Sequence, residues 1–343
     1  MSKTVKNLSA GSLLFILAGF AAGQDKGKPA YSFSSYDEMR TRVVALYQEK
    51  KYQEAADILL WGWEKFPDRA RANAYNLALM YGYLSELDKG VRMLGAALDR
   101  GGFYGLWEFE ADPWAPYRET AGFKEFLARN KARIEEAQKA ARLKVEVETP
   151  EGFGRTKAYP LFIALHGGGE NLAEFKPRWT SPGLRKRFLV AYVQSTQVAS
   201  MTGFHWQDAA VTKRDLAEAY AQIKKDYPVD EANVILGGFS SGGYGSLVAL
   251  LDNALPARGF VVLCPPVPEI LTEDKIRSMK ARGIKGTFLT TEMDGRLAEQ
   301  TKMCDALKKG GLDVDFIVFP NVGHWYPDDL GARIDAALER LLK

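Results

Sequence analysis

Hydrophobic residues follow two different periods along the chain, and the change falls near Leu143. From about Tyr36 to Leu143 they recur at three- and four-residue spacing, as in "EMRTRVVALYQEKKYQEAADILLWGWEKFPD", where Pro67 is a stop signal. This spacing is typical of amphipathic helices. Beyond Leu143, short and uniformly apolar runs alternate with helical stretches. The pattern predicts a helical unit at residues 24–142 and a mixed unit at residues 143–343.

The apolar runs of the second unit predict the strands of a mostly parallel sheet. A run without alternation suits a strand that is buried on both faces, and strands that alternate with helices indicate a doubly wound α/β domain. The segment "LKVEVETP" at 143–150 does alternate, and it predicts an edge strand. The other runs are "YPLFIAL", "FLVAYVQ", "NVILGGF", "GFVVLC", "GTFLTT" and "VDFIVFP". Ligands of such sheets bind at the carboxyl ends of the strands, so we expect the chemistry there.

The helical unit contains an internal repeat. Aligning "KKYQEAADIL" with "SELDKGVRML" places Ala55 opposite Gly90, at a period of about 35 residues. These motifs resemble the tetratricopeptide repeat, and "ADPWAPYRETAGFKEFLAR" resembles the segment that closes such arrays. The resemblance implies helix pairs that could bind a protein partner; a generic helical bundle is the alternative. Because isolated arrays usually need three or more units, two repeats are expected to pack against the second unit.

The N-terminus has the pattern of a secretory signal. Lys3 and Lys6 precede the apolar run "LLFILAGFAA", and small residues follow it before Gln24. A charged start, a short apolar run and small residues are typical of a cleaved signal peptide. We therefore predict a signal at residues 1–23, an exported (periplasmic or extracellular) protein and no integral membrane span after processing. An uncleaved anchor or a chance apolar start are the alternatives.

Composition narrows the classes of partner. Apolar residues make up 46% and charged residues 26% of the chain, and the net charge is only +3, which is typical of a soluble globular protein without a nucleic-acid or anionic membrane surface. Cys264 and Cys304 cannot form a disulfide scaffold. Two separate buried thiols are favoured, and a single bridge stays open. Histidines and carboxylates show no metal-ligand spacing, so neither a metal nor an organic cofactor is expected.

A glycine-rich turn follows the run "NVILGGF". Residues 238–242, "GFSSG", fit G-x-S-x-G, the strand-to-helix turn that exposes a nucleophilic serine. A serine hydroxyl needs a base to remove its proton. His324, in "FPNVGHWYPDD" after the last predicted strand, is the candidate base, whereas His166 is expected to shape its loop. The pattern thus predicts Ser240 as nucleophile and His324 as its base.

The remaining components of the site are also predicted at strand ends. "GTFLTTEMDGR" offers Glu292 and Asp294 as the orienting acid, and we favour Asp294 because it lies further past the strand. The amides of Gly168, Gly169 and Ser241 are the candidate oxyanion donors. The candidate pocket walls are Trp179, His205, Trp206 and Trp325, with Phe204, Pro265 and Pro266 as further candidates.

The chain order of serine, acid and histidine is that of the α/β-hydrolase superfamily. Residues 143–343 resemble that superfamily through "LHGGGE", "GFSSGG", "TEMDG" and "VGHWYP", and they are most similar to small esterases and predicted peptidases without a cap. One departure is that Thr291 and Glu292 stand where the family often has glycine before the acid. The resemblance implies a serine hydrolase that cleaves a small-molecule ester through an acyl-enzyme, and the predicted signal segment makes it an exported one. A serine peptidase or amidase of the same fold is one alternative, and a catalytically inactive hydrolase fold used as a binding module is the other.

Overall fold

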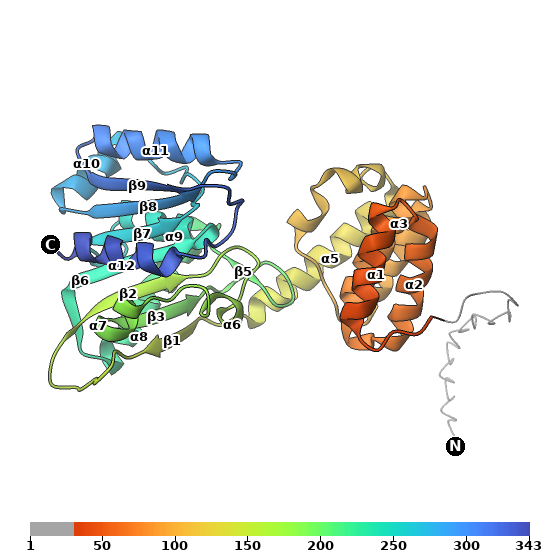
Figure 1. Ribbon diagram of the computed structural model, residues 1–343, viewed down its shortest axis with the longest axis horizontal. Helices are drawn as coiled ribbons and strands as arrows, with labels where there is room; N and C mark the ends of the chain where they lie inside the picture. The colour runs from red at the N-terminus through yellow and green to blue at the C-terminus, as the bar shows by residue number, and fades with distance from the viewer. Residues whose placement is uncertain (1–30) are drawn as a thin grey trace, which may run out of the picture.

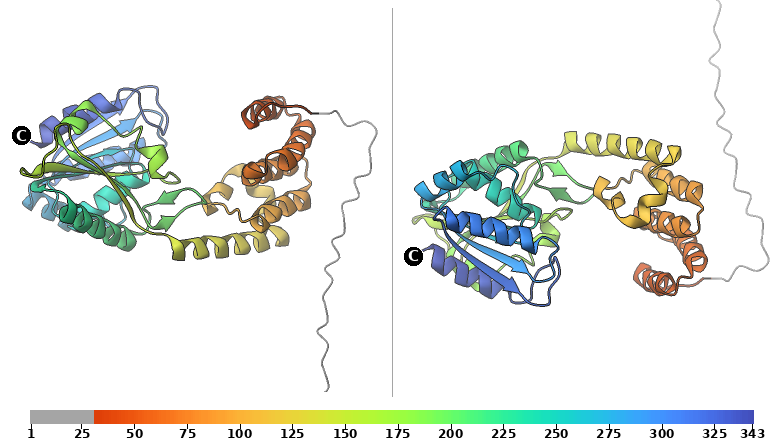
Figure 2. Two further views of the ribbon diagram at one scale, coloured as in Figure 1. Left: turned by 90° about the horizontal axis from the view of Figure 1, so that it is seen from below. Right: turned by 90° about the horizontal axis from the view of Figure 1, so that it is seen from above.

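The computed structural model describes residues 31–343, and the predicted signal segment lies outside them. Figure 1 shows a helical unit and an α/β unit, and the long helix α5 (Ala121–Ala140) runs from the first to the second. The two further views in Figure 2 show the same separation. The helical pattern ends at Ala140, and the first strand begins at Lys144, close to the change of period in the sequence.

In the helical unit, consecutive helices pack on one another, as expected for chain segments joined by short turns. Tyr117 packs so closely on Gly90 that a Cβ there would lie 2.0 Å from the tyrosine hydroxyl oxygen, and Ala55 is fully buried. The close approach expected at the two small residues of the repeat is thus seen at Gly90, and Ala55 lies inside the helical core. Tetratricopeptide identity remains a prediction. The elements are α1 (Tyr36–Gln48), α2 (Tyr52–Lys65), η1 (Pro67–Arg69), α3 (Ala70–Tyr83), α4 (Leu87–Asp99), η2 (Leu106–Phe109), η3 (Asp112–Tyr117) and α5.

The strands of the second unit form a seven-stranded sheet within the described residues. Their order is β1-β3-β2-β6-β7-β8-β9; β1 is antiparallel to β3, and the other neighbours are parallel. The predicted mostly parallel sheet with an alternating edge strand is confirmed. The strands are β1 (Lys144–Glu148), β2 (Tyr159–Leu165), β3 (Leu189–Gln194), β6 (Val229–Phe239), β7 (Gly259–Leu263), β8 (Lys285–Thr291) and β9 (Asp313–Phe319).

Helices cover both faces of this sheet, as the uniformly apolar strands require. Along β2, Leu161 and Ile163 enter one core, and Phe162 and Ala164 enter the other, because successive strand side chains point to opposite faces. The first core is completed by α8 (Ala209–Asp226), α9 (Ser241–Leu251), α10 (Glu273–Ala281) and α11 (Leu297–Lys309). The second is completed by α6 (Leu172–Phe175), α7 (Pro182–Arg187) and α12 (Leu330–Leu341).

A short antiparallel ribbon, β4 (Gln197–Val198) with β5 (Phe204–His205), was not predicted. Each of its strands has two residues, too few for a hydrophobic period to be visible. The ribbon nevertheless joins the two units, because Gln138 of α5 accepts a hydrogen bond from Val198 N (2.9 Å) and donates one to Thr196 O.

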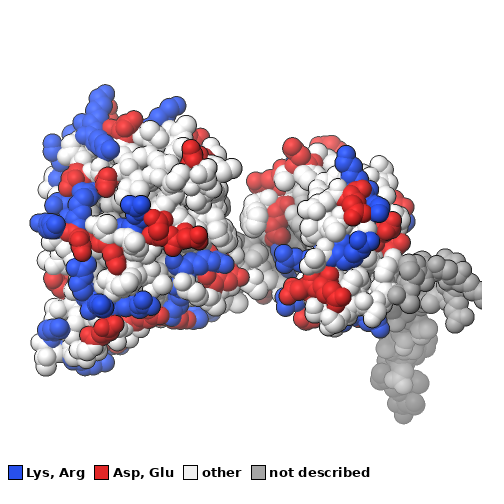
Figure 3. All heavy atoms as spheres, viewed as in Figure 1, with Lys and Arg blue, Asp and Glu red and all other residues white. Residues whose placement is uncertain are grey.

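The surface fits the composition. On the face shown in Figure 3, lysine and arginine side chains are interspersed with aspartate and glutamate. No helix among residues 31–343 is both long enough and apolar enough to cross a bilayer. Cys264 and Cys304 are both free and buried, so the open question of a bridge is resolved in favour of two separate thiols.

Candidate active site

Ser240 lies in a sharp turn between the end of β6 and the start of α9. Its backbone has φ 50° and ψ −113°, a conformation that costs a side-chain-bearing residue free energy and occurs mainly at functional sites. The flanking glycines have no room for a side chain: a Cβ on Gly238 would lie 2.6 Å from Leu165 O, and one on Gly242 would lie 2.1 Å from the same oxygen. Close packing of the turn against β2 therefore explains both glycines of the motif.

His324 and Asp294 complete a hydrogen-bonded chain with the serine. Ser240 Oγ lies 2.9 Å from His324 Nε2, and His324 Nδ1 lies 2.9 Å from Asp294 Oδ2. With the proton on Nδ1, the imidazole donates to the carboxylate and accepts from the hydroxyl. The three residues follow β6, β8 and β9, so the carboxyl ends of separate strands bring them together.

Asp294 is held in its ionised form. Burial acts to raise its pKa, but hydrogen bonds from Arg296 N, His324, Gln300 and Cys264 outweigh burial and lower the pKa to about 2. Arg296 N donates at 2.9 Å and Gln300 Nε2 at 3.1 Å. A carboxylate that is fixed by several donors can orient an imidazole and stabilise its protonated form.

Glu292, the other candidate acid, does not contact the imidazole. The chain turns directly after β8, since Asp294 N donates to Thr291 O at 3.1 Å. This turn breaks the strand alternation that would have put both carboxylates on similar sides. Glu292 is exposed and accepts a hydrogen bond from Asn321 N (2.8 Å), so it contacts the loop that carries His324.

Two of the three N–H groups predicted as oxyanion donors are free to bind an oxyanion in the part of the chain that the structure describes. Gly168 N and Ser241 N have no hydrogen-bond acceptor within residues 31–343, and a Cβ on Gly168 would lie 3.4 Å from Ser241 Cβ, so the two backbones are adjacent. The prediction for Gly169 is wrong: its N–H donates to Phe204 O at 2.8 Å, because the loop pairs with the unpredicted β5. The candidate oxyanion hole therefore consists of Gly168 N and Ser241 N.

Glu170, which the sequence analysis did not single out, connects the oxyanion loop to the histidine loop. Its buried carboxylate accepts hydrogen bonds from Gly167 N (2.7 Å), the Tyr326 hydroxyl (2.7 Å) and Arg178 Nη1 (2.8 Å). Tyr326 comes two residues after His324. An acid directly after the glycine run of "LHGGGE" was the available signal. Glu170 thus fixes two catalytic loops relative to each other.

The other two histidines lie near the serine without contacting it. His166 is fully buried; its Nδ1 donates to Gly167 O (2.8 Å), and its Nε2 accepts from Ser195 N (3.4 Å). Burial lowers its pKa to about 4, so the ring is neutral. It is bonded to its own loop at Gly167, as expected, and also to the backbone that follows β3 at Ser195. Burial also lowers the pKa of His205, whose ring lines the cavity at Ser240.

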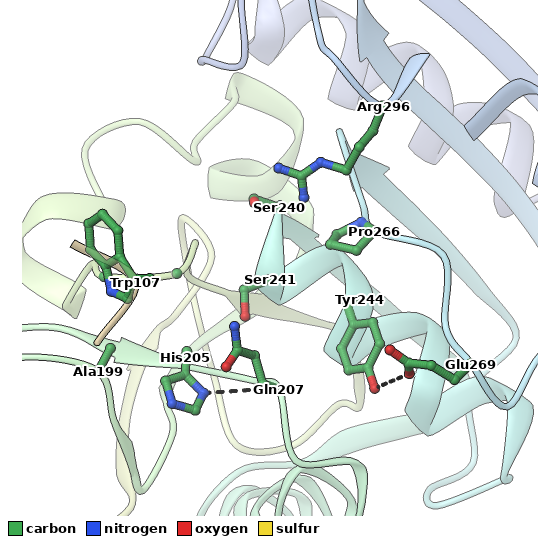
Figure 4. A pocket seen from close by; sticks show the side chains of 12 residues that line it. Trp107, Ala199, His205, Gln207, Ser240, Ser241, Tyr244, Pro266, Glu269 and Arg296 are labelled. Carbon is green, nitrogen blue, oxygen red and sulfur yellow. Dashed lines mark hydrogen bonds between the residues drawn. The ribbon is translucent and has the colours of Figure 1, made fainter. Parts of the chain in front are cut away.

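A cavity of about 500 Å³ opens at Ser240. Figure 4 shows Trp107, Ala199 and His205 on one side of Ser241. The opposite side holds Tyr244, Pro266 and Glu269. His205 and Pro266 were predicted to line the cavity, whereas the lining side chains of Trp107, Ala199, Gln207, Tyr244, Glu269 and Arg296 were not predicted.

Five of the seven candidate pocket walls do not line this cavity: Trp179, Phe204, Trp206, Pro265 and Trp325. Trp179 is fully buried in the core beside Phe175, and Trp206 is fully buried with its ring 5.4 Å from that of His166. Trp325 is 53% exposed and packs against Phe239 away from the cavity lining of the described residues. A large aromatic residue near a strand end can face either the core or a cavity, and its sequence position does not distinguish the two.

Cys264 lies beneath the catalytic pair. Its Sγ, a carboxylate oxygen of Asp294 and an imidazole nitrogen of His324 lie within 4.8 Å of one another. These atom types can ligate a metal ion, and sequence spacing could not reveal the group because its members come from three loops. Here the carboxylate and the imidazole are bonded to each other, so the geometry is that of an acid–base pair.

Comparison of sequences gives one partial match to a curated protein. No family model matches the chain. Among curated proteins, the probable dipeptidyl-peptidase 5 of Aspergillus terreus (strain NIH 2624 / FGSC A1156) is 23% identical over 218 residues, which are 51% of this chain and 30% of that protein. The chain therefore spans less than a third of that relative's length.

Solved structures resemble the chain at the level of the fold. An uncharacterized protein from Bacillus cereus ATCC 10987 is 24% identical with a TM-score of 0.50, and the match covers 90% of this chain and 98% of that one. Esterase PE8 is 17% identical with a TM-score of 0.47, over 58% of this chain and 99% of its own. The sheet order, the crossing helices and the turn at Ser240 are those of an α/β-hydrolase fold.

Proposed function

We propose that this chain, which has an α/β-hydrolase fold, is a serine hydrolase that cleaves carboxylic esters through an acyl-enzyme. The observation that supports the proposal is the unbroken hydrogen-bond chain from Ser240 Oγ through His324 to Asp294 at a 500 Å³ cavity. A hydroxyl next to a correctly oriented base is an activated nucleophile.

The proposed reaction has two steps. Ser240 Oγ attacks the ester carbonyl carbon while its proton passes to His324 Nε2, and Gly168 N and Ser241 N donate hydrogen bonds to the oxyanion. His324 then returns the proton to the departing alcohol, which leaves the acyl group on Ser240. In the second step water gives a proton to His324 and attacks the acyl carbon, and the carboxylic acid departs as Ser240 regains its proton.

A second candidate is a serine peptidase, and one lining residue favours it. The carboxylate of Glu269 faces the cavity and accepts a hydrogen bond from the Tyr244 hydroxyl at 2.9 Å. A fixed carboxylate beside the nucleophile could bind the protonated amine of an aminoacyl substrate. The fungal relative is named a probable dipeptidyl-peptidase, although the match covers a minor part of it.

Two measurements test these proposals. A fluorophosphonate probe should label the wild-type protein and leave Ser240→Ala unlabelled. Turnover of p-nitrophenyl esters is then compared with turnover of aminoacyl p-nitroanilides, with Glu269→Gln as the variant that weakens amine binding. Faster hydrolysis of the anilides, lost in Glu269→Gln, would replace the ester proposal with the peptidase. Absence of labelling in the wild type would reject both.

A further inference from the structure

We propose that the helical unit supplies one wall of the active site, and that its Trp107 binds an aromatic or flat apolar group of the substrate. This inference rests on the proposed function, since it takes Ser240 as the reacting group. Trp107 lies 133 residues before Ser240, in η2 of the helical unit. It nevertheless lines the same cavity as Ser240, Gly168 and Ser241.

The indole is close to the oxyanion loop. A Cβ on Gly169 would lie 3.6 Å from Cζ2 of Trp107, so the ring edge lies beside that loop with room for no more than a small side chain between them. Trp107 is nevertheless 55% exposed. An indole with this much exposed surface in the cavity of a nucleophile offers a flat apolar face that a substrate group can cover.

The position of Trp107 is fixed by the helical unit. In η2 the neighbouring Glu108 accepts a hydrogen bond from Gly105 N (2.8 Å) and forms an ion pair with Arg71 of α3. The Tyr75 hydroxyl donates to Glu108 O at 2.8 Å. These contacts hold the short helix on α3, so the indole is presented by a rigid support.

The helical unit is also fastened to the cavity rim. A Cβ on Gly105 would lie 2.8 Å from Ala199 O, and Ala199 lines the cavity. Gln138 of α5 bonds to Val198 N and Thr196 O in the same segment. Contacts at two places therefore join the helical unit to residues 196–199, which continue directly into the lining of the site.

The two sides of the cavity differ in chemistry. On the side opposite Trp107, Tyr244 and Glu269 form a hydrogen-bonded polar pair. The other side presents the indole of Trp107 and Ala199, with the imidazole of His205 beside them. A substrate that fits both sides places a ring or flat apolar group against Trp107 and its polar part towards Glu269.

The test uses two pairs of esters, and the members of each pair differ by an aromatic ring. In the first pair the ring is on the alcohol, as benzyl acetate is compared with ethyl acetate. In the second pair the ring is on the acyl group, as ethyl phenylacetate is compared with ethyl propanoate. In at least one pair, Trp107→Ala should lower kcat/KM for the ring-bearing ester about tenfold, mainly through KM, because an aromatic contact is lost. The small ester of that pair should change less than about twofold. Trp107→Phe should retain most of the preference.

Leu106→Ala is the matched control. Leu106 is adjacent in η2 and 44% exposed, but it does not line the cavity, so its removal should change neither pair. Equal effects of Trp107→Ala on ring-bearing and small esters in both pairs, or no effect, would overturn the inference.

Failure of the proposed function is recognisable separately. If the wild type is labelled by a fluorophosphonate but cleaves none of the four esters, the ester proposal fails alone. The role of Trp107 is then tested with labelling rates. Trp107→Ala should slow labelling by a phenyl-bearing fluorophosphonate about tenfold relative to labelling by an ethyl-bearing one. Equal slowing of the two reagents would overturn the inference. A wild type that is neither labelled nor active removes both proposals.

Discussion

Asp294 and Glu292 are two residues apart and differ completely in their contacts. Sequence order could place an acid between Ser240 and His324, but the turn after β8 decides which carboxylate meets the imidazole. Hydrogen bonding of Asp294 N to Thr291 O is local backbone geometry, and no hydrophobic period encodes it. At the residue scale the types of group were therefore predictable, whereas their orientation came from the folded backbone.

Asp294→Asn should lower kcat by as much as about 10⁴-fold, because an asparagine leaves the imidazole in the wrong tautomer. Glu292→Gln should cost less than about tenfold, since within residues 31–343 the Glu292 carboxylate accepts its one hydrogen bond from Asn321 N and none from the imidazole. Ester turnover is the measurement, with circular dichroism to verify folding of both variants. The reverse order of the two effects would make Glu292 the orienting acid.

The lowered pKa of Asp294 has a consequence for acid stability. Its carboxylate favours the folded state when ionised, so its contribution is fully present above the ordinary value of 3.8 and is lost as the pH falls through about 2. Between these values the free energy of unfolding of the wild type, relative to Asp294→Asn, should fall by about 2 kcal/mol. Urea denaturation from pH 5 to 2 measures this. Asp328→Asn, which removes an exposed carboxylate of the same region, is the reference; a difference that is independent of pH would contradict the prediction.

At the scale of elements, the strands and the two units could be predicted, and the connections between loops could not. The apolar runs were sufficient because each buried strand needs hydrophobic residues on both faces. The ribbon of β4 and β5 was missed because two residues carry no period, and its absence from the prediction led to the error at Gly169. Loops are held by individual polar contacts, such as those of Glu170, which leave no repeating signal.

Glu170→Gln should lower kcat for esters by roughly 10- to 100-fold, because the neutral amide weakens the contacts to Arg178, Gly167 N and Tyr326 and lets the oxyanion and histidine loops shift. Glu174→Gln, an exposed carboxylate in α6, is the control and should retain activity. The fluorophosphonate labelling rate should fall in parallel with kcat, whereas a purely structural role would lower the melting temperature and leave the labelling rate unchanged.

At the scale of the whole molecule, the helical unit and the α/β unit meet at a small number of named contacts. The sequence indicated that two repeats would need the second unit to pack against, but it did not indicate where. Gly105 and Gln138 are ordinary residues in their own segments. Their role comes from the placement of α5 and η2 against residues 196–199, and a contact between distant segments has no local pattern.

Gln138→Ala should loosen this junction. The Val198 amide loses its acceptor, so its hydrogen exchange should accelerate about tenfold, which corresponds to the loss of one hydrogen bond. Lys139→Ala, which removes an exposed neighbour on the same helix, should leave that exchange rate unchanged. Exchange followed by mass spectrometry on peptides that cover 194–200 makes the comparison; unchanged protection in Gln138→Ala would mean that the hydrogen bond does not hold the segment.

Cys264 lies beside Asp294 and His324, so the reactivity of its thiol reports local opening of the active site. The side chain is fully buried, and burial raises its pKa to about 12, so in the closed protein it is both inaccessible and protonated. Alkylating agents react with exposed thiolates. The alkylation rate of Cys264 under native conditions, read by mass spectrometry, therefore measures how often this part of the active site opens to solvent. Cys304, buried in α11, reports opening at its own position, so a difference between the two rates separates local opening at the site from opening elsewhere in the unit.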